Sequence, residues 1–207
     1  MSGPAPYDPI ADFSGQERWV RDRLDDLGLV PSGPFERVHV RPWATALLVP
    51  TGAGPLWFKA HTPLLAREAP VTRVLAALRP GTVLDVLVSD DERCWLLTRD
   101  AGEKIRGRIA TTDDLRRLEP VLAAYGDLQR AAAEQTDALL AAGALDRRTD
   151  RVAGLLTEAL LADEGSGGEG QLEPLTGSER DRLLARVPLL EELAVRAGSV
   201  VGDSIDH

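Results

Sequence analysis

The sequence predicts an α+β protein in which a β-rich first half is followed by a second half made only of helices. Short apolar runs separated by turn residues dominate residues 1–99, whereas apolar residues at helical spacing dominate residues 100–207. The 207 residues suffice for one large domain or two small lobes. Apolar residues make up 43% of the chain and charged residues 28%, which is typical of a globular protein and argues against wholesale disorder.

A helix and a β-hairpin are expected first. Residues 1–13 are rich in Pro and Gly and predict a flexible arm. Ser14 and Glu17 have the spacing of a capping box, and the apolar residues behind them predict a helix over 15–27. Three strands are predicted next, over 35–43, 45–49 and 56–60.

A helix and two more strands complete the β-rich half. Apolar residues at helical spacing predict a helix over 64–78, with Pro70 inside it. Because proline lacks a backbone N–H and clashes with the preceding turn, this helix should either kink or begin near Ala69. Residues 82–88 and 93–98 then predict two strands joined by a polar turn.

Only helices are predicted after Asp100, apart from a strand at the end. A capping sequence at 111–114 opens the first helix, in which Pro120 should cause a bend, and a second helix covers 147–161. Residues 163–174 are rich in Gly and Glu and predict a flexible loop.

A third helix is predicted from Ser178 to a stop at Gly198, followed by a short strand over 199–205. The two halves meet near residue 99. We therefore expect a first lobe at 14–99 and a helical second lobe at 100–207.

Charge and composition exclude several function classes. The net charge of −9 disfavours binding to nucleic acid, which requires a basic face. The N-terminus shows no signal peptide, and no apolar run approaches the roughly 20 residues that span a bilayer. The single cysteine, Cys94, excludes an intrachain disulfide and a multi-cysteine zinc site. We therefore expect a cytoplasmic protein without nucleic-acid or membrane partners.

Lysine is almost absent from the chain. Of the 24 basic residues, two are lysine, Lys59 and Lys104, and the rest are arginine. Lys59 ends an apolar stretch in the third predicted strand, where an ammonium group needs a carboxylate partner. Glu68 is the natural candidate because it lies nine residues later, at the start of the next predicted helix. Alternatively, Lys59 extends from a strand end into water and Glu68 is an ordinary solvated helix residue.

The motifs around Lys59 resemble those of the aminoglycoside phosphotransferase family, which are small-molecule kinases with a protein-kinase-like fold. In that family the third strand ends in a lysine, the inserted helix carries a glutamate, and the fifth strand runs into the hinge between two lobes. The segments that carry the resemblance are 57–60 (WFKA), 67–69 (REA), 94–102 (CWLLTRDAG), 125–129 (YGDLQ) and 204–207 (SIDH). The resemblance implies a protein-kinase-like N-lobe, with about five antiparallel strands and an inserted helix, and an incomplete helical C-lobe.

The resemblance also implies a nucleotide site. Lys59, held by Glu68, would contact the phosphates of ATP or GTP accompanied by Mg²⁺. The backbone of Thr98 and Arg99 would offer hydrogen bonds to the edge of the base. The acceptor would be a small molecule with a hydroxyl group, which the sequence does not identify.

Two features depart from the family pattern. The turn at 40–45 contains no glycine, so its backbone cannot approach phosphates as closely as a glycine-rich loop does. The chain ends at His207, where the family's catalytic loop (H-G-D-x-x-x-x-N) would begin. The resemblance therefore implies the N-terminal portion of a phosphotransferase, which has no catalytic or metal-binding residue of its own, binds nucleotide weakly and is inactive alone. The alternative is a non-catalytic, kinase-derived binding or regulatory module.

Overall fold

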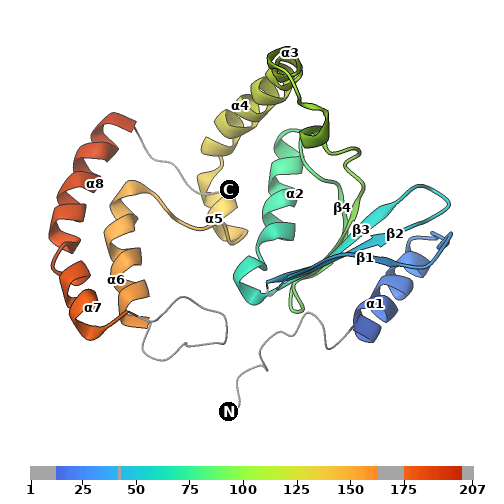
Figure 1. Ribbon diagram of the computed structural model, residues 1–207, viewed down its shortest axis with the longest axis horizontal. Coiled ribbons are helices and arrows are strands. Elements are labelled where there is room, and N and C mark those ends of the chain that lie inside the picture. Colours follow the sequence, from blue (N-terminus) through green and yellow to red (C-terminus); the bar gives the residue numbers. More distant parts are fainter. Residues whose placement is uncertain (1–12, 42, 163–174, 202–207) are drawn as a thin grey trace. The chain divides into compact units, whose positions relative to one another are not determined.

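The computed structural model describes residues 13–41, 43–162 and 175–201 (Figure 1). The chain divides into two compact units, Met1–Gly143 and Ala144–His207. The first unit contains a sheet and several helices, and the second contains helices. Residues 1–12 of the expected arm and the whole expected loop at 163–174 lie outside the described residues.

A five-stranded sheet forms the centre of the first unit. All neighbouring strands are antiparallel, in the order β1-β2-β3-β5-β4. The strands are β1 (Glu36–Arg41), β2 (Ala44–Val49), β3 (Leu56–His61), β4 (Val86–Asp90) and β5 (Trp95–Arg99). The prediction of an α+β fold with about five antiparallel strands is thus confirmed. The order places β3 directly beside β5, although a helix and β4 separate them in the sequence.

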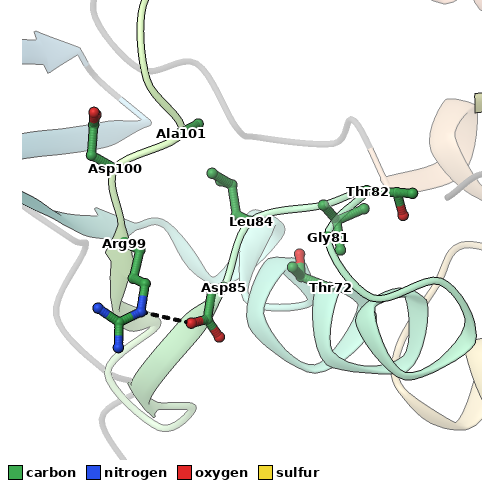
Figure 2. Close-up of a pocket in the computed structure, with 9 residues that line it drawn as sticks. Thr72, Gly81, Thr82, Leu84, Asp85, Arg99, Asp100 and Ala101 are labelled. Carbon is green, nitrogen blue, oxygen red and sulfur yellow. Dashed lines mark hydrogen bonds and ion pairs between the residues drawn. The ribbon is translucent and has the colours of Figure 1, made fainter. Parts of the chain in front are cut away.

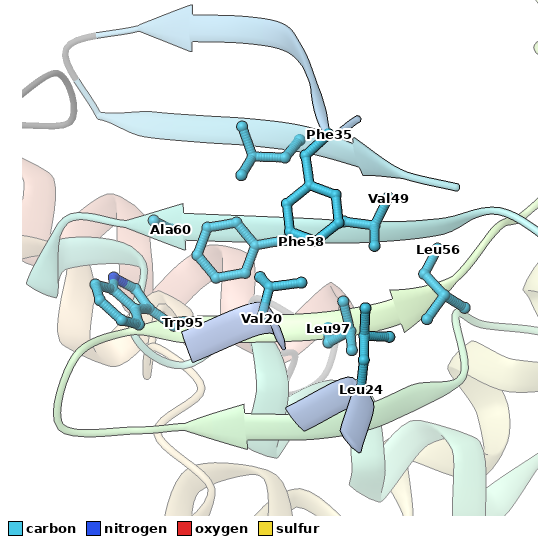
Figure 3. Close-up of a cluster of buried hydrophobic side chains, with 10 residues drawn as sticks. Val20, Leu24, Phe35, Val49, Leu56, Phe58, Ala60, Trp95 and Leu97 are labelled. Carbon is cyan, nitrogen blue, oxygen red and sulfur yellow. The ribbon is translucent and has the colours of Figure 1, made fainter. Parts of the chain in front are cut away.

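Helix α1 (Phe13–Asp26) packs on one face of the sheet. Val20 and Leu24 of α1 are fully buried against side chains such as Phe58 and Leu97 (Figure 3). The helix was expected over 15–27 with Val20, Leu24 and Leu27 on its apolar face; the first two are buried as expected, whereas Leu27 lies beyond the helix and is 39% exposed. The expected capping box is wrong, however, because the helix begins at Phe13 and Ser14 therefore lies inside its first turn.

Helix α2 (Glu68–Leu78) follows the 3-10 turn η1 (Pro63–Leu65) and lies against the other face of the sheet (Figure 1). Successive residues of a strand point to opposite faces. Phe58 of β3 packs against α1, whereas its neighbour Lys59 contacts α2. Pro70 is the third residue of α2, where its missing N–H has no partner in the helix to lose. The helix therefore begins next to Ala69, one of the two outcomes expected, and does not kink there.

Five short helical segments follow β5 in the first unit. They are η2 (Ile105–Arg108), α3 (Thr112–Leu115), η3 (Arg116–Leu118), α4 (Glu119–Ala133) and α5 (Thr136–Ala141). Thr111 and Asp114 form the expected cap of α3. Pro120 was expected to bend a continuous helix. It is instead the second residue of α4, so one helical segment ends and another begins there. Helix α5 was not predicted. Because all these segments belong to Met1–Gly143, this compact unit extends beyond the lobe expected at 14–99.

The second unit consists of η4 (Thr149–Arg151), α6 (Val152–Ala162), α7 (Gly177–Leu184) and α8 (Val187–Val201). The third predicted helix is therefore two helices, with Pro188 as the second residue of α8. The predicted stop at Gly198 and the strand from 199 are wrong, because α8 continues to Val201; residues 202–207 lie outside the described residues. A Cβ at Gly198 would lie 3.0 Å from Thr149 Oγ1, so this glycine permits close packing and does not end the helix. In the part of the chain that the structure describes, no helix is both long and apolar enough to cross a bilayer.

Replacing Gly154 with alanine is expected to raise the free energy of unfolding of the second unit by about 0.5–1 kcal/mol. Gly154 lies on the exposed side of α6, and no atom lies within 4 Å of the position that a Cβ would take. Alanine therefore improves helix propensity without a steric cost. Thermal and urea denaturation followed by circular dichroism measure the change. The matched variant Gly198→Ala should gain less or lose stability, and equal gains would contradict the close packing at Gly198.

Candidate functional site

The structure brings Lys59 and Glu68 together. Lys59, near the end of β3, donates a hydrogen bond from Nζ to Glu68 Oε1 over 2.5 Å. Both side chains are 31% exposed, so the pair lies at the surface of the sheet and remains open to solvent. Glu68 is the first residue of α2, and the turn η1 returns the chain over the strand that carries Lys59. The pair thus connects the third strand with the helix that follows it.

His61 is a third member of this cluster that the sequence did not single out. It follows Lys59 by two residues on the same face of β3, and its Nε2 lies 2.8 Å from Glu68 Oε2. Its side chain is only 6% exposed. Neither nitrogen of His61 makes a well-aligned hydrogen bond among the described residues, so the contact is an ion pair when the imidazole is protonated. Its two-residue spacing from Lys59 places it on the same face of the strand, but the sequence does not show which partner it meets there.

Glu68 is held in its charged form. Burial acts to raise the pKa of this carboxyl group, but the nearby side chains of His61 and Lys59 outweigh it and lower the pKa from 4.5 to about 2. Each carboxylate oxygen faces one basic side chain. The carboxylate thereby fixes the positions of two basic groups on the surface of β3.

A pocket of about 360 Å³ lies beside this cluster, over the face of β1, β2 and β3 that bears Lys59. We call it the basic pocket. Its basic side chains are those of His39, Arg41, Lys59 and His61. The remaining lining residues are Trp43, Ala44, Thr45, Ala46 and Leu65. None of the described residues that line it is acidic, although Glu68 contacts Lys59 and His61 from beside it; with Arg41 and Lys59 in its wall the pocket suits an anion.

Thr98 and Arg99, the expected base-binding residues, lie in β5 and outside the basic pocket. Thr98 is buried beside Trp57, and Arg99 is opposite Leu56. The backbone N–H of Arg99 donates to Asp85 O over 3.0 Å, and its Nε lies 2.9 Å from Asp85 Oδ2 (Figure 2). This backbone donor is therefore already used by the residue that precedes β4.

A second pocket, of about 660 Å³, lies where the chain leaves β5 (Figure 2). Arg99, Asp100 and Ala101 line it together with residues that precede β4, among them Leu84 and Asp85. The structure thus places Lys59 and Arg99 in separate pockets on the same unit.

Trp57 connects the two regions. It precedes Lys59 by two residues on the same face of β3, and its indole Nε1 donates to Asp100 Oδ1 over 2.6 Å. The sequence did not assign this role to Trp57.

Comparison with known proteins does not identify a family for this chain. No model of a known protein family matches the chain, and no curated protein matches it either. Among the residues that the structure describes, no three His, Cys, Asp or Glu side chains are grouped so as to hold a metal ion. Fold and site together define an α+β unit with a cationic pocket on the open part of its sheet.

Proposed function

We propose that the first unit binds a nucleoside triphosphate, as the nucleotide lobe of a small-molecule phosphotransferase similar to the aminoglycoside kinases. The observation that carries this proposal is the ion pair between Lys59 and Glu68. In protein kinases, a lysine on the third strand is held by a glutamate of the following helix and contacts the phosphates. Here the third strand of the sheet and the helix after it supply the same two residue types in contact.

The physical arrangement suits phosphate binding. Lys59 is fixed by Glu68 yet 31% exposed, and it lines the basic pocket. A cation that is already oriented loses little freedom when an anion binds, and phosphoryl transfer depends mainly on positioning and charge neutralisation. Lysine also differs from arginine in presenting a compact point charge, which suits contact with a phosphate in a chain whose basic residues are mostly arginine.

The strand order supports the position proposed for the base. Because β5 is the neighbour of β3, the chain that leaves β5 starts close to the strand that carries Lys59. The backbone N–H of Arg99 is occupied by Asp85, so the hydrogen bonds to the base would come from the following residues, Asp100 and Ala101. ATP or GTP would be bound together with Mg²⁺. The described residues contain no group of three His, Cys, Asp or Glu side chains that could hold this ion, so we give the metal no role in the proposal.

Replacing Lys59 with alanine is expected to weaken ATP binding by about tenfold or more, the loss of at least one phosphate contact. Isothermal titration calorimetry with ATP and Mg²⁺ measures the dissociation constants. Lys104→Ala is the matched control, because it removes the only other lysine, which is exposed and lies outside the basic pocket.

The control variant should bind ATP as the unchanged protein does. Circular dichroism should show that both variants are folded. Equal affinities for Lys59→Ala and the unchanged protein, or no binding of ATP by the unchanged protein, would contradict the proposed function.

A further inference from the structure

The basic pocket has a regular construction that follows from strand register. Two rows of paired residues cross β1, β2 and β3, and in each row an alanine of β2 separates two basic residues. The rows are His39–Ala46–Lys59 and Arg41–Ala44–His61. All six residues line the pocket. The pocket therefore has an alanine floor, with basic side chains from β1 along one side and from β3 along the other.

A β-bulge produces this arrangement. Arg37 pairs with Leu47, but His39 pairs with Ala46, so the register shifts by one residue between them. A shift of one residue reverses the face to which the following side chains point. The bulge thus turns His39 and Arg41 to the face of the sheet that bears Lys59.

The dimensions of the floor suit a chain of phosphate groups. Neighbouring strands lie about 4.8 Å apart, so the backbones of β1 and β3 are about 10 Å apart, and the two rows are separated by about 7 Å along the strands. The methyl groups of Ala44 and Ala46 fill little of this space. Two or three linked phosphates fit between the side chains that border the floor.

The charge on the β1 side is not compensated within the described part of the chain. Glu68 contacts Lys59 and His61, whereas no ion pair joins His39 or Arg41 to an acidic side chain among the described residues. Both β1 residues are exposed. Arginine binds phosphate through two parallel hydrogen bonds, so Arg41 is the stronger candidate for direct contact.

We propose that an extended polyphosphate group lies along the alanine floor, held by Arg41 and His39 on one side and Lys59 on the other. This inference rests on the proposed function, in which the group is the triphosphate of the nucleotide. The turn between β1 and β2 has no glycine, so its backbone is poorly suited to enclose phosphates. Side chains of β1 replace the backbone contacts, and the site therefore recognises polyphosphate even without a base.

Replacing Arg41 with alanine is expected to weaken binding of inorganic tripolyphosphate and of ATP by about tenfold each. Titration calorimetry of both ligands gives the dissociation constants, and circular dichroism verifies the fold. Arg79→Ala is the matched control, because Arg79 is exposed just after the end of α2, lines neither pocket, and its side chain donates only to Leu78 O among the side-chain hydrogen bonds of the described residues. This control should change either affinity by less than about twofold. Arg41→Lys should retain part of the affinity, because it keeps the charge but loses the paired hydrogen bonds.

The binding results distinguish a failure of the polyphosphate site from a failure of the proposed nucleotide-binding function. If Lys59→Ala weakens ATP binding and Arg41→Ala does not, the inference is overturned and the proposed function stands. If tripolyphosphate binds in an Arg41-dependent manner and ATP does not bind, the proposed function fails and the polyphosphate site stands. If neither ligand binds the unchanged protein, both are overturned.

Discussion

Replacing Phe58 with alanine is expected to lower the free energy of unfolding of the first unit by about 3–5 kcal/mol. Phe58 is fully buried at the centre of β3 and packs against the rings of Trp19 and Trp95, with centroids 5.7 and 5.8 Å away. Removing the ring leaves a cavity between α1 and the sheet that these rigid neighbours cannot fill. Urea denaturation followed by tryptophan fluorescence measures the loss.

The size of this effect follows from the position of Phe58. A folded domain is stable by only about 5–15 kcal/mol, so the variant should lose a large part of its stability. Val30→Ala is the control, because Val30 is 74% exposed and its truncation should change stability by less than about 0.5 kcal/mol. A loss below about 1 kcal/mol for Phe58→Ala would contradict a close-packed layer between α1 and the sheet.

Acidification is expected to destabilise the first unit through Glu68. The folded-state pKa of this residue, about 2, lies below its usual value of 4.5. The ion pair therefore contributes its full stability above pH 4.5, and this contribution is lost as the pH falls toward 2. Because the side chain is 31% exposed and water screens the pair, we expect a contribution of about 1–2 kcal/mol.

The variant Glu68→Gln isolates this contribution. At neutral pH it should be less stable than the unchanged protein by about 1–2 kcal/mol, and the difference should shrink as the pH falls from 4.5 toward 2. Urea denaturation at a series of pH values measures it. Glu36→Gln, at an exposed position of β1, should leave the pH profile nearly unchanged. A constant difference between Glu68→Gln and the unchanged protein across this range would contradict the coupling.

The pairing of Lys59 and Glu68 could be anticipated from the sequence, because a lysine at the end of an apolar strand needs a carboxylate and one lies at the next helix start. The role of His61 could not. A single histidine without a partner at ligand spacing gives no signal, and its partner appears only when α2 folds back over β3. The sequence motif around Lys59 therefore predicted a role for this lysine and none for His61.

The contribution of β1 to the pocket depends on the bulge between Arg37 and His39, and the sequence gives no sign of it. The bulge contains no glycine, and the alternation of Val38 and Val40 is compatible with either register. The faces of His39 and Arg41 are therefore decided by pairing with β2, which is a tertiary property. Strand positions were predictable here, whereas the orientation of the side chains that matter was not.

Helical spacing had a similar limit in the later helices. Leu122, Tyr125 and Leu128 recur at helical spacing, which predicts one apolar face, yet Leu122 is 63% exposed, Tyr125 is 50% exposed and Leu128 is buried. Periodicity identifies a face, but the packing partner decides how much of it is covered. Gly198 is a second example. A glycine near the end of a helical pattern predicts a helix stop, but in the structure its small size allows close packing against Thr149.

Pro70 limits how α2 can change its length beside the ion pair between Lys59 and Glu68. Pro70 has no N–H that could donate to the carbonyl group of Ala66, so α2 cannot extend toward its N-terminus as a regular helix. A change by one helical turn would displace a side chain by about 5.4 Å, enough to withdraw Glu68 from Lys59. The proline opposes such rewinding, so the ion pair is not a switch operated by growth of this helix.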